Sequence, residues 1–332
     1  MIRFIGLRLL RIVLSLLVVS LVTFLLVQAV PGSYADVAAA QAQGTAGGVT
    51  IHNTYGSDVP AWLRYWRFVW GFVRLHMGPS FKYPSQSVEH IIGQALPVSA
   101  ALAVTAVLVA LAIAIPVGVL AAVRHDSRVD YWSMFTVTVA HSIPNFLLAV
   151  LLILTMSRGL HVLPTGGWTG PKSMVLPVLS LALPIAAVLA RYMRASMITT
   201  LNEEYVLAAM SKGGSLSKVV YRHALRNSLT AIVTVTGPTL ASLTTGTVFI
   251  ETVFRIPGLG RYFTDAATSR DIPLLMGTTM FFALVLMVMN LAVDLIYGML
   301  DPRVRVRQFG ERSRLGRLRR NGVRTLAPGG GR

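Results

Sequence analysis

The side chains best suited to binding are concentrated in one polar segment, residues 201–229, which lies between two long apolar runs. Asn202 is a good helix N-cap, and Glu203 and Glu204 follow it where carboxylates favour the positive end of the helix dipole. We therefore expect a helix to begin at Asn202. The chemistry available to such a short polar helix is the recognition of another surface.

Two glycines should divide this polar segment. Gly213 and Gly214 supply the positive φ angles that end helices, so the first helix should run to Lys212. Ser215 can cap a second helix. That helix would carry three cations, Lys218, Arg222 and Arg226.

One face of the first helix suits close contact with a partner. Tyr205, Ala208, Ala209 and Lys212 share that face by the 3.6-residue period, and the alanines leave room for another surface to approach. The spacing alone also fits a cationic helix that rests on anionic lipid head groups. Both interpretations stay open at the level of the residues.

Catalytic and metal-binding patterns give little support to an enzyme. The sequence has no G-x-x-x-x-G-K-[ST] phosphate loop, no H-E-x-x-H pair and no cysteine, and its seven histidines show no metal-ligand spacing. Gly78-Pro79-Ser80 and Gly213-Gly214-Ser215 begin like a nucleophile elbow but lack its closing glycine. We predict no catalytic residue, no metal site and no cofactor on this chain.

Acidic residues inside apolar runs would indicate proton-driven transport. Asp294 is the one acidic residue well inside such a run, seven positions before Asp301. We expect it to form a structural ion pair near the inner membrane surface, with a proton relay as the alternative. We expect Glu251 to lie at the interface at the outer end of an apolar run.

The elements that would position these residues are membrane spans. The chain of 332 residues is 54% hydrophobic and only 13% charged, which is too apolar for an ordinary soluble domain. A span needs about 20 apolar residues. Six segments qualify, so we predict an all-α protein with six transmembrane helices, at residues 12–35, 91–123, 131–157, 173–190, 227–250 and 272–300.

The spans divide the chain into four regions. Residues 1–35 form a cytoplasmic N-terminus with the first span, and residues 36–94 form an extracytoplasmic loop. In that loop, aromatic residues mixed with arginines predict an amphipathic helix at the membrane interface, with Trp62, Tyr65, Trp66, Phe68 and Trp70. Residues 95–307 hold the other five spans and a polar loop at 191–227. We expect residues 308–332 to form a basic, disordered cytoplasmic tail.

The distribution of charge sets the orientation. The chain carries 30 Lys and Arg against 13 Asp and Glu, a formal net charge of +17. Of the 30 cations, 21 lie in the segments on the side of the two termini and nine on the opposite side. The positive-inside rule therefore places both termini and the polar segment in the cytoplasm of a multi-pass plasma-membrane protein. The net charge reports topology and a membrane partner, and it does not predict a nucleic-acid partner.

Short motifs along the chain resemble one known family. Ala208-Ala209-x-x-x-Gly213 is similar to the cytoplasmic EAA loop of binding-protein-dependent ABC importer permeases. The chain as a whole, up to about Arg305, resembles the first permease subunit of dipeptide/oligopeptide ABC importers. The residues that carry this resemblance include Val30-Pro31-Gly32, Ser142-Ile143-Pro144-Asn145-Phe146, Leu163-Pro164-Thr165-Gly166, Arg194-Ala195-Ser196-Met197, Glu251-Thr252-Val253-Phe254, Pro257-Gly258-Leu259-Gly260 and Asp294-Leu295-Ile296-Tyr297.

The resemblance implies a type I ABC importer permease fold and a set of partners. These are a second homologous permease subunit, two cytoplasmic ATPase subunits and an extracytoplasmic peptide-binding protein, with ATP and magnesium bound by the ATPases. It also implies that the first helix of the polar segment is the coupling helix. The residues carried over to it are Glu203, Glu204, Tyr205, Ala208, Ala209, Lys212 and Gly213.

Other functions remain as alternatives. Similar permeases move nickel or glutathione, so the cargo of an ABC permease is open. A proton-coupled secondary transporter of small solutes belongs to a different class, and a membrane-anchored scaffold or receptor would transport nothing. Inhibition of uptake by vanadate or by a protonophore separates the first two classes.

Overall fold

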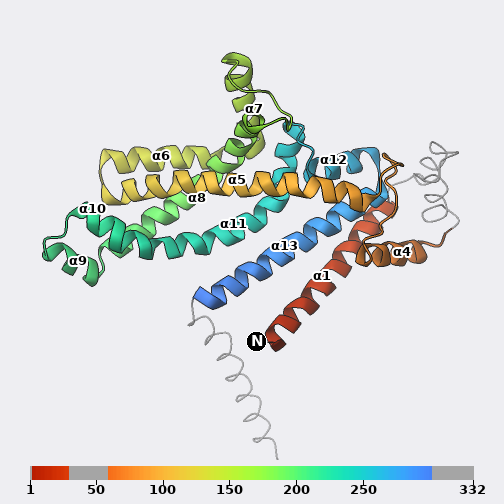
Figure 1. Cartoon of the computed structure of the whole chain (residues 1–332), viewed down its shortest axis with the longest axis horizontal. Coiled ribbons are helices and arrows are strands. Elements are labelled where there is room, and N and C mark those ends of the chain that lie inside the picture. Colours follow the sequence, from red (N-terminus) through yellow and green to blue (C-terminus); the bar gives the residue numbers. More distant parts are fainter. Residues whose placement is uncertain (1, 30–58, 301–332) are drawn as a thin grey trace, which may run out of the picture.

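The computed structural model describes residues 2–29 and 59–300, and the regular elements of these residues are helices (Figure 1). The all-α fold class is confirmed. In chain order, the helices are α1 (Ile2–Ala29), α4 (Ala61–Val73), α5 (Val88–Val123), α6 (Arg128–Ser142), α7 (Asn145–Leu152), the π-helix η1 (Ile153–Gly159), α8 (Pro171–Leu201), α9 (Glu204–Ser211), α10 (Leu216–Val219), the π-helix η2 (Val220–Ala224), α11 (Leu225–Val253), α12 (Leu259–Ser269) and α13 (Ile272–Leu300).

Four helices in the described residues are long and apolar enough to cross a membrane, namely α1, α5, α8 and α13. A fifth span results if α6 and the α7–η1 helix are counted as one broken crossing. The fifth predicted span, 227–250, is helical within α11 but is not among these candidates. Six spans are therefore not fully confirmed. The predicted tail, 308–332, and the end of the first predicted span lie outside the described residues.

Small residues let α5 and α8 pack closely at the centre of the molecule. Ala110 and Ala114 of α5 are buried against Ala182 and Ala186 of α8. A methyl group on Gly118 would lie 2.5 Å from the Met193 Cβ atom, so only glycine fits at this crossing. In lipid the hydrophobic effect does not drive helices together, because lipid tails are as apolar as the helices. Small residues instead allow the close backbone contact that holds spans together.

The predicted third span, residues 131–157, is broken near its middle. Pro144 separates α6 from α7, and the two helical segments are bent by 100° (Figure 1). Ile143 has extended backbone angles, as the residue before a proline prefers. Residues 131–157, predicted as one span, therefore form two helices that meet at Pro144.

Asp271 anchors the start of α13, at the end of the molecule far from α9. Its carboxylate is buried and accepts hydrogen bonds from the Ser80 hydroxyl, the Lys82 backbone N–H at 3.0 Å and the Leu274 backbone N–H at 3.1 Å. The bond from Leu274 caps α13, and the other two fix the chain that leads into α5.

Candidate functional site

The polar segment begins where α8 ends. This helix continues to Leu201, well past the predicted end of the fourth span at Ala190. Asn202 terminates it, and its side-chain amide donates to the Ile198 carbonyl oxygen at 3.0 Å. The N-cap predicted at Asn202 is therefore wrong, because Asn202 closes the preceding helix. Glu203, with extended backbone angles, occupies the N-cap position of α9.

The short helix α9 has one anchored face and one free face. Val206, on the anchored face of α9, is fully buried, whereas Glu204, Tyr205 and Ala208 are exposed. Lys212, the residue after the helix, is exposed as well. These four exposed residues, together with half-buried Ala209 and exposed Glu203, are available to a docking partner. Tyr205, Ala208 and Lys212 share an exposed face, as the helical period predicts.

The two glycines after α9 are needed for different reasons. Gly213 has a φ of +80°, which favours glycine at the end of a helix. Gly214 does not have a positive φ, so the prediction for that residue is wrong. A methyl group there would lie 2.8 Å from the Ala209 carbonyl oxygen, so Gly214 permits close approach of the backbone to α9.

The second half of the polar segment is continuous with α11. Ser215 precedes α10 with extended backbone angles, and α10, η2 and α11 follow one another without a break. The predicted cations Lys218, Arg222 and Arg226 are exposed. On the opposite side, buried Val220 and Ala224 pack against Met193 and Met197 of α8.

Polar contacts connect α9 to α11, and α11 in turn to α8. The Asn227 side-chain amide of α11 donates to the Tyr205 hydroxyl at 3.1 Å. Ser228, the next residue of α11, is buried and its hydroxyl donates to the Thr200 hydroxyl of α8 at 3.1 Å. A displacement of α9 would therefore act on α8 and α11 together.

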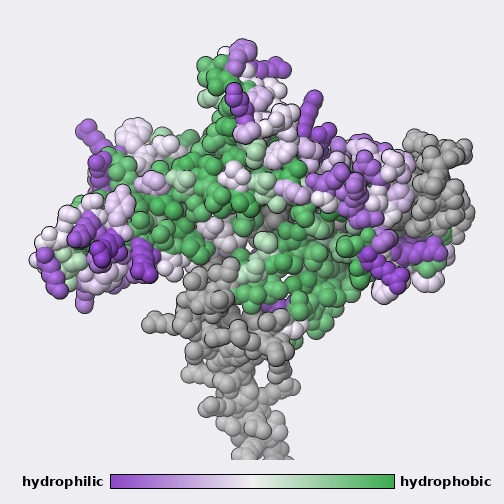
Figure 2. Space-filling view, in the orientation of Figure 1, coloured by the Kyte–Doolittle hydropathy of each residue, from purple (hydrophilic) through white to green (hydrophobic). Residues whose placement is uncertain are grey.

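The surface around this segment is polar, and the surface beside it is apolar. Figure 2 shows hydrophilic residues gathered over α9 and α10, while hydrophobic residues cover the broad face that includes α13. The segment thus lies at one end of the long apolar helices, where it can reach an aqueous partner.

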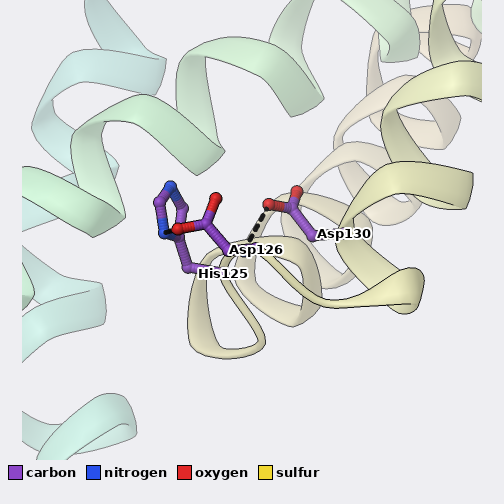
Figure 3. A group of neighbouring side chains, drawn as sticks. All are labelled: His125, Asp126 and Asp130. Atoms are coloured by element: carbon purple, nitrogen blue, oxygen red, sulfur yellow. Dashed lines mark hydrogen bonds and ion pairs between the residues drawn. The ribbon is translucent and has the colours of Figure 1, made fainter.

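A cluster of three ionisable residues lies near the polar segment, on the loop before α6 and in the first turn of that helix. His125, Asp126 and Asp130 have ligand atoms within 4.8 Å of one another (Figure 3). However, the buried Asp130 carboxylate already binds the Arg194 guanidinium through two contacts, at 2.6 and 2.7 Å, and it accepts from the Asp126 backbone N–H at 3.1 Å. Because Asp130 is satisfied by this cation, the cluster is better explained as an ion pair that fastens α6 to α8 than as a metal site.

Sequence reasoning missed this ion pair. Asp130 and Arg194 lie 64 residues apart, and no local spacing connects them. A cavity of about 600 Å³ opens beside the pair, lined also by Tyr131, Met134 and Phe135. Only the three-dimensional structure shows that this buried aspartate pairs with an arginine near the end of α8.

Glu251 and Asp294 are two further acidic residues with predicted positions. Glu251 is fully buried, and its carboxylate accepts from the Gly260 backbone N–H at 2.7 Å and the Arg261 backbone N–H at 3.3 Å, at the start of α12. Its place at the membrane interface stays a prediction. Asp294 lies in α13, but its side chain is outside the described part of the structure, so its ion pair stays a prediction.

The sequence matches the family model described as "Binding-protein-dependent transport system inner membrane component" over residues 114–306. The model for the N-terminal region of the same components matches residues 1–103. The chain belongs to this family of membrane transport components. The family assignment predicted from the motifs is confirmed, and such a transport component is not itself an enzyme.

Curated members of the family match almost the whole chain. The dipeptide transport system permease protein DppB of Bacillus subtilis (strain 168) is 38% identical over 298 residues, which are 89% of this chain and 96% of the relative. The oligopeptide transport system permease protein OppB of Haemophilus influenzae is 34% identical over 307 residues, covering 92% of this chain and all of the relative.

Solved structures confirm the fold of this family member. A chain of the MetNI methionine ABC transporter, in an inward-facing conformation, matches with a TM-score of 0.52. The match covers 64% of this chain and 96% of that chain at 17% identity. The protein therefore has the type I ABC importer permease fold.

Proposed function

We propose that this protein is the permease subunit of an ATP-driven importer of di- and oligopeptides. The observation that carries the proposal is the similarity to dipeptide and oligopeptide permeases over about nine-tenths of the chain. The cargo of those relatives is peptide, and no motif of this chain supports an enzymatic role of its own. In this proposal the polar segment lies in the cytoplasm with both termini.

The proposed coupling helix is α9. Its exposed residues present a small alanine-lined face, and small side chains allow the close backbone approach that helix docking needs. Val206 fixes the helix from beneath. An ATPase subunit would contact Glu203, Glu204, Tyr205, Ala208, Ala209, Lys212 and Gly213.

Force would pass from α9 into the spans through specific contacts. The hydrogen bond between Tyr205 and Asn227 connects α9 to α11, and the bond between Ser228 and Thr200 connects α11 to α8. Closure of two ATPases on ATP would draw two such helices together, one from each permease subunit. The spans would then shift between two packings, with the peptide delivered by an extracytoplasmic binding protein.

Replacing Ala208 with Trp tests this docking. We expect uptake of a labelled dipeptide by the complete reconstituted assembly to fall to background, because the indole would occupy the space that the ATPase surface needs. Membrane insertion should be unchanged, since the Ala208 side chain is exposed.

Ser217→Trp is the matched control, because Ser217 is exposed on the neighbouring α10 and lies outside the docking face. Its uptake should stay near the wild-type rate. Normal transport by the Ala208→Trp variant, or an equal loss in both variants, would show that α9 is not the docking element.

A further inference from the structure

Helix α4 has two apolar faces, and the protein covers one of them. Phe68 and Val69 are buried against Phe24 of α1 and against Met276 and Met280 of α13. On the other face, tryptophans follow one another at four-residue spacing, so they form one stripe along the helix. This stripe, Trp62, Trp66 and Trp70, is exposed by 67%, 54% and 57% respectively.

The contacts of α4 fix its depth along the spans. The Tyr65 hydroxyl lies 3.3 Å from the Leu17 carbonyl oxygen and 3.0 Å from the Ser20 hydroxyl, both on α1. At 1.5 Å per residue, Leu17 and Ser20 lie roughly 18 and 14 Å before Ala29 along the helix axis. Tyr65 therefore contacts α1 well inside the helix rather than beyond its end.

The contacts with α13 also lie inside that helix. Met276 and Met280 lie roughly 6 and 12 Å along α13 from its first residue, Ile272. Both α1 and α13 are long and apolar enough to cross a membrane. Helix α4 thus lies beside two spans, within the layer that they cross, at the end of the molecule far from α9 (Figure 1).

The composition of the outer face matches a lipid interface. Tryptophan is enriched where acyl chains meet head groups, because its ring is apolar and its N–H needs a polar partner. The Arg74 guanidinium lies 4.7 Å from the centre of the Trp70 ring, and α4 contains no acidic residue. The positive charge of Arg74 therefore complements the negative charge of lipid phosphate groups.

We propose that the tryptophan stripe of α4 binds phospholipids of the leaflet far from the polar segment, with Arg74 beside their phosphate groups. The stripe continues the lipid-facing surface of α1, whose Leu25 and Leu26 are exposed by 57% and 65%. Tryptophan rings at this depth anchor the α1–α4–α13 corner against vertical displacement. This role is independent of the cargo and of the ATPase partners.

Spin labelling tests the proposal directly, because the chain has no cysteine. In the complete assembly in lipid nanodiscs, a nitroxide is attached at Trp66→Cys, at Leu25→Cys on α1 as the lipid control and at Ser217→Cys, which is exposed on α10 outside the docking face, as the water control. Collision of the label with oxygen, which partitions into lipid, is compared with collision with a water-soluble nickel chelate.

We expect the oxygen-to-nickel collision ratio at Trp66 to match that at Leu25 and to exceed that at Ser217 several-fold. A ratio equal to that at Ser217 would place the stripe in water and overturn the proposal. A label that neither reagent reaches would mean that a protein partner covers the stripe, which also overturns it. Trp62→Cys and Trp70→Cys repeat the measurement if the Trp66 variant does not fold.

Discussion

At the scale of single residues, Glu251 explains why glycine stands at the N-cap of α12 and again at the second residue of that helix. Its buried carboxylate accepts from the first backbone N–H groups of that helix, where a negative charge is favourable. The chain must approach closely for these bonds to form. A methyl group on Gly258 would collide with the carboxylate, and one on Gly260 would lie under 3.0 Å from the Val248 backbone.

Gly260→Ala should therefore destabilise the protein by about 1–3 kcal/mol, the usual cost of overpacking a well-filled site. Thermal unfolding of the purified protein in detergent measures the effect. Gly93→Ala is the matched control, since a methyl group at this helical glycine meets nothing within 4 Å. The stability of the control variant should rise by about 0.5–1 kcal/mol, because alanine has a higher helix propensity than glycine. Equal melting temperatures for Gly260→Ala and wild type would contradict the packing argument.

At the scale of elements, the ion pair between Asp130 and Arg194 fastens the start of α6 to α8. The Asp130 side chain is 6% exposed and that of Arg194 is 26% exposed. Arg194→Gln would leave the aspartate charge buried without a cation, and we expect a loss of up to about 3 kcal/mol of stability. The melting temperature of the reconstituted protein should fall accordingly.

Two comparisons isolate the pair. Arg191→Gln removes an exposed cation from the same helix and should change the melting temperature little. The double variant Asp130→Asn/Arg194→Gln should recover part of the loss, because no unpaired charge remains. The single variant Asp130→Asn completes the cycle. If the loss of stability in the double variant equals the sum of the losses in Asp130→Asn and Arg194→Gln, the two residues do not interact energetically.

The elements also show which features the sequence could predict. Apolar length predicted two of the spans closely, since the predicted 91–123 became Val88–Val123 and 272–300 coincided with α13. Helix ends were less predictable. Helix α8 runs past Arg191 to Leu201, because hydrogen bonding continues a helix after its apolar stretch ends.

Contacts between distant residues could not be predicted. Asp130 with Arg194, Tyr65 with Leu17 and Asp271 with Ser80 join residues that are far apart in the sequence, and no local period connects them. In the candidate site, the exposed face of α9 and the positive φ of Gly213 followed from local patterns. The N-cap was wrong, because Asn202 could serve either helix and the fold assigns it to α8.

At the scale of the whole molecule, long apolar helices separate two ends at which hydrophilic residues gather (Figures 1 and 2). One end carries α9, and the opposite end carries α4 and α12. A permease needs this division, because the proposed ATP-driven force and the delivered cargo act on opposite sides of the membrane. The sequence contains no G-x-x-x-x-G-K-[ST] phosphate loop, and in the proposed function the ATPase subunits bind the nucleotide.

The assembly that is purified from membranes through this chain should therefore contain two nucleotide-hydrolysing chains. Its uptake of labelled dipeptide in vesicles should be blocked by vanadate and should persist with a protonophore, because ATP hydrolysis rather than a proton gradient supplies the free energy. Excess unlabelled peptide should compete for uptake, whereas nickel and glutathione should not. Uptake by this chain alone, or a collapse of uptake with the protonophore, would instead indicate a proton-coupled carrier, with Asp294 as the first residue to replace.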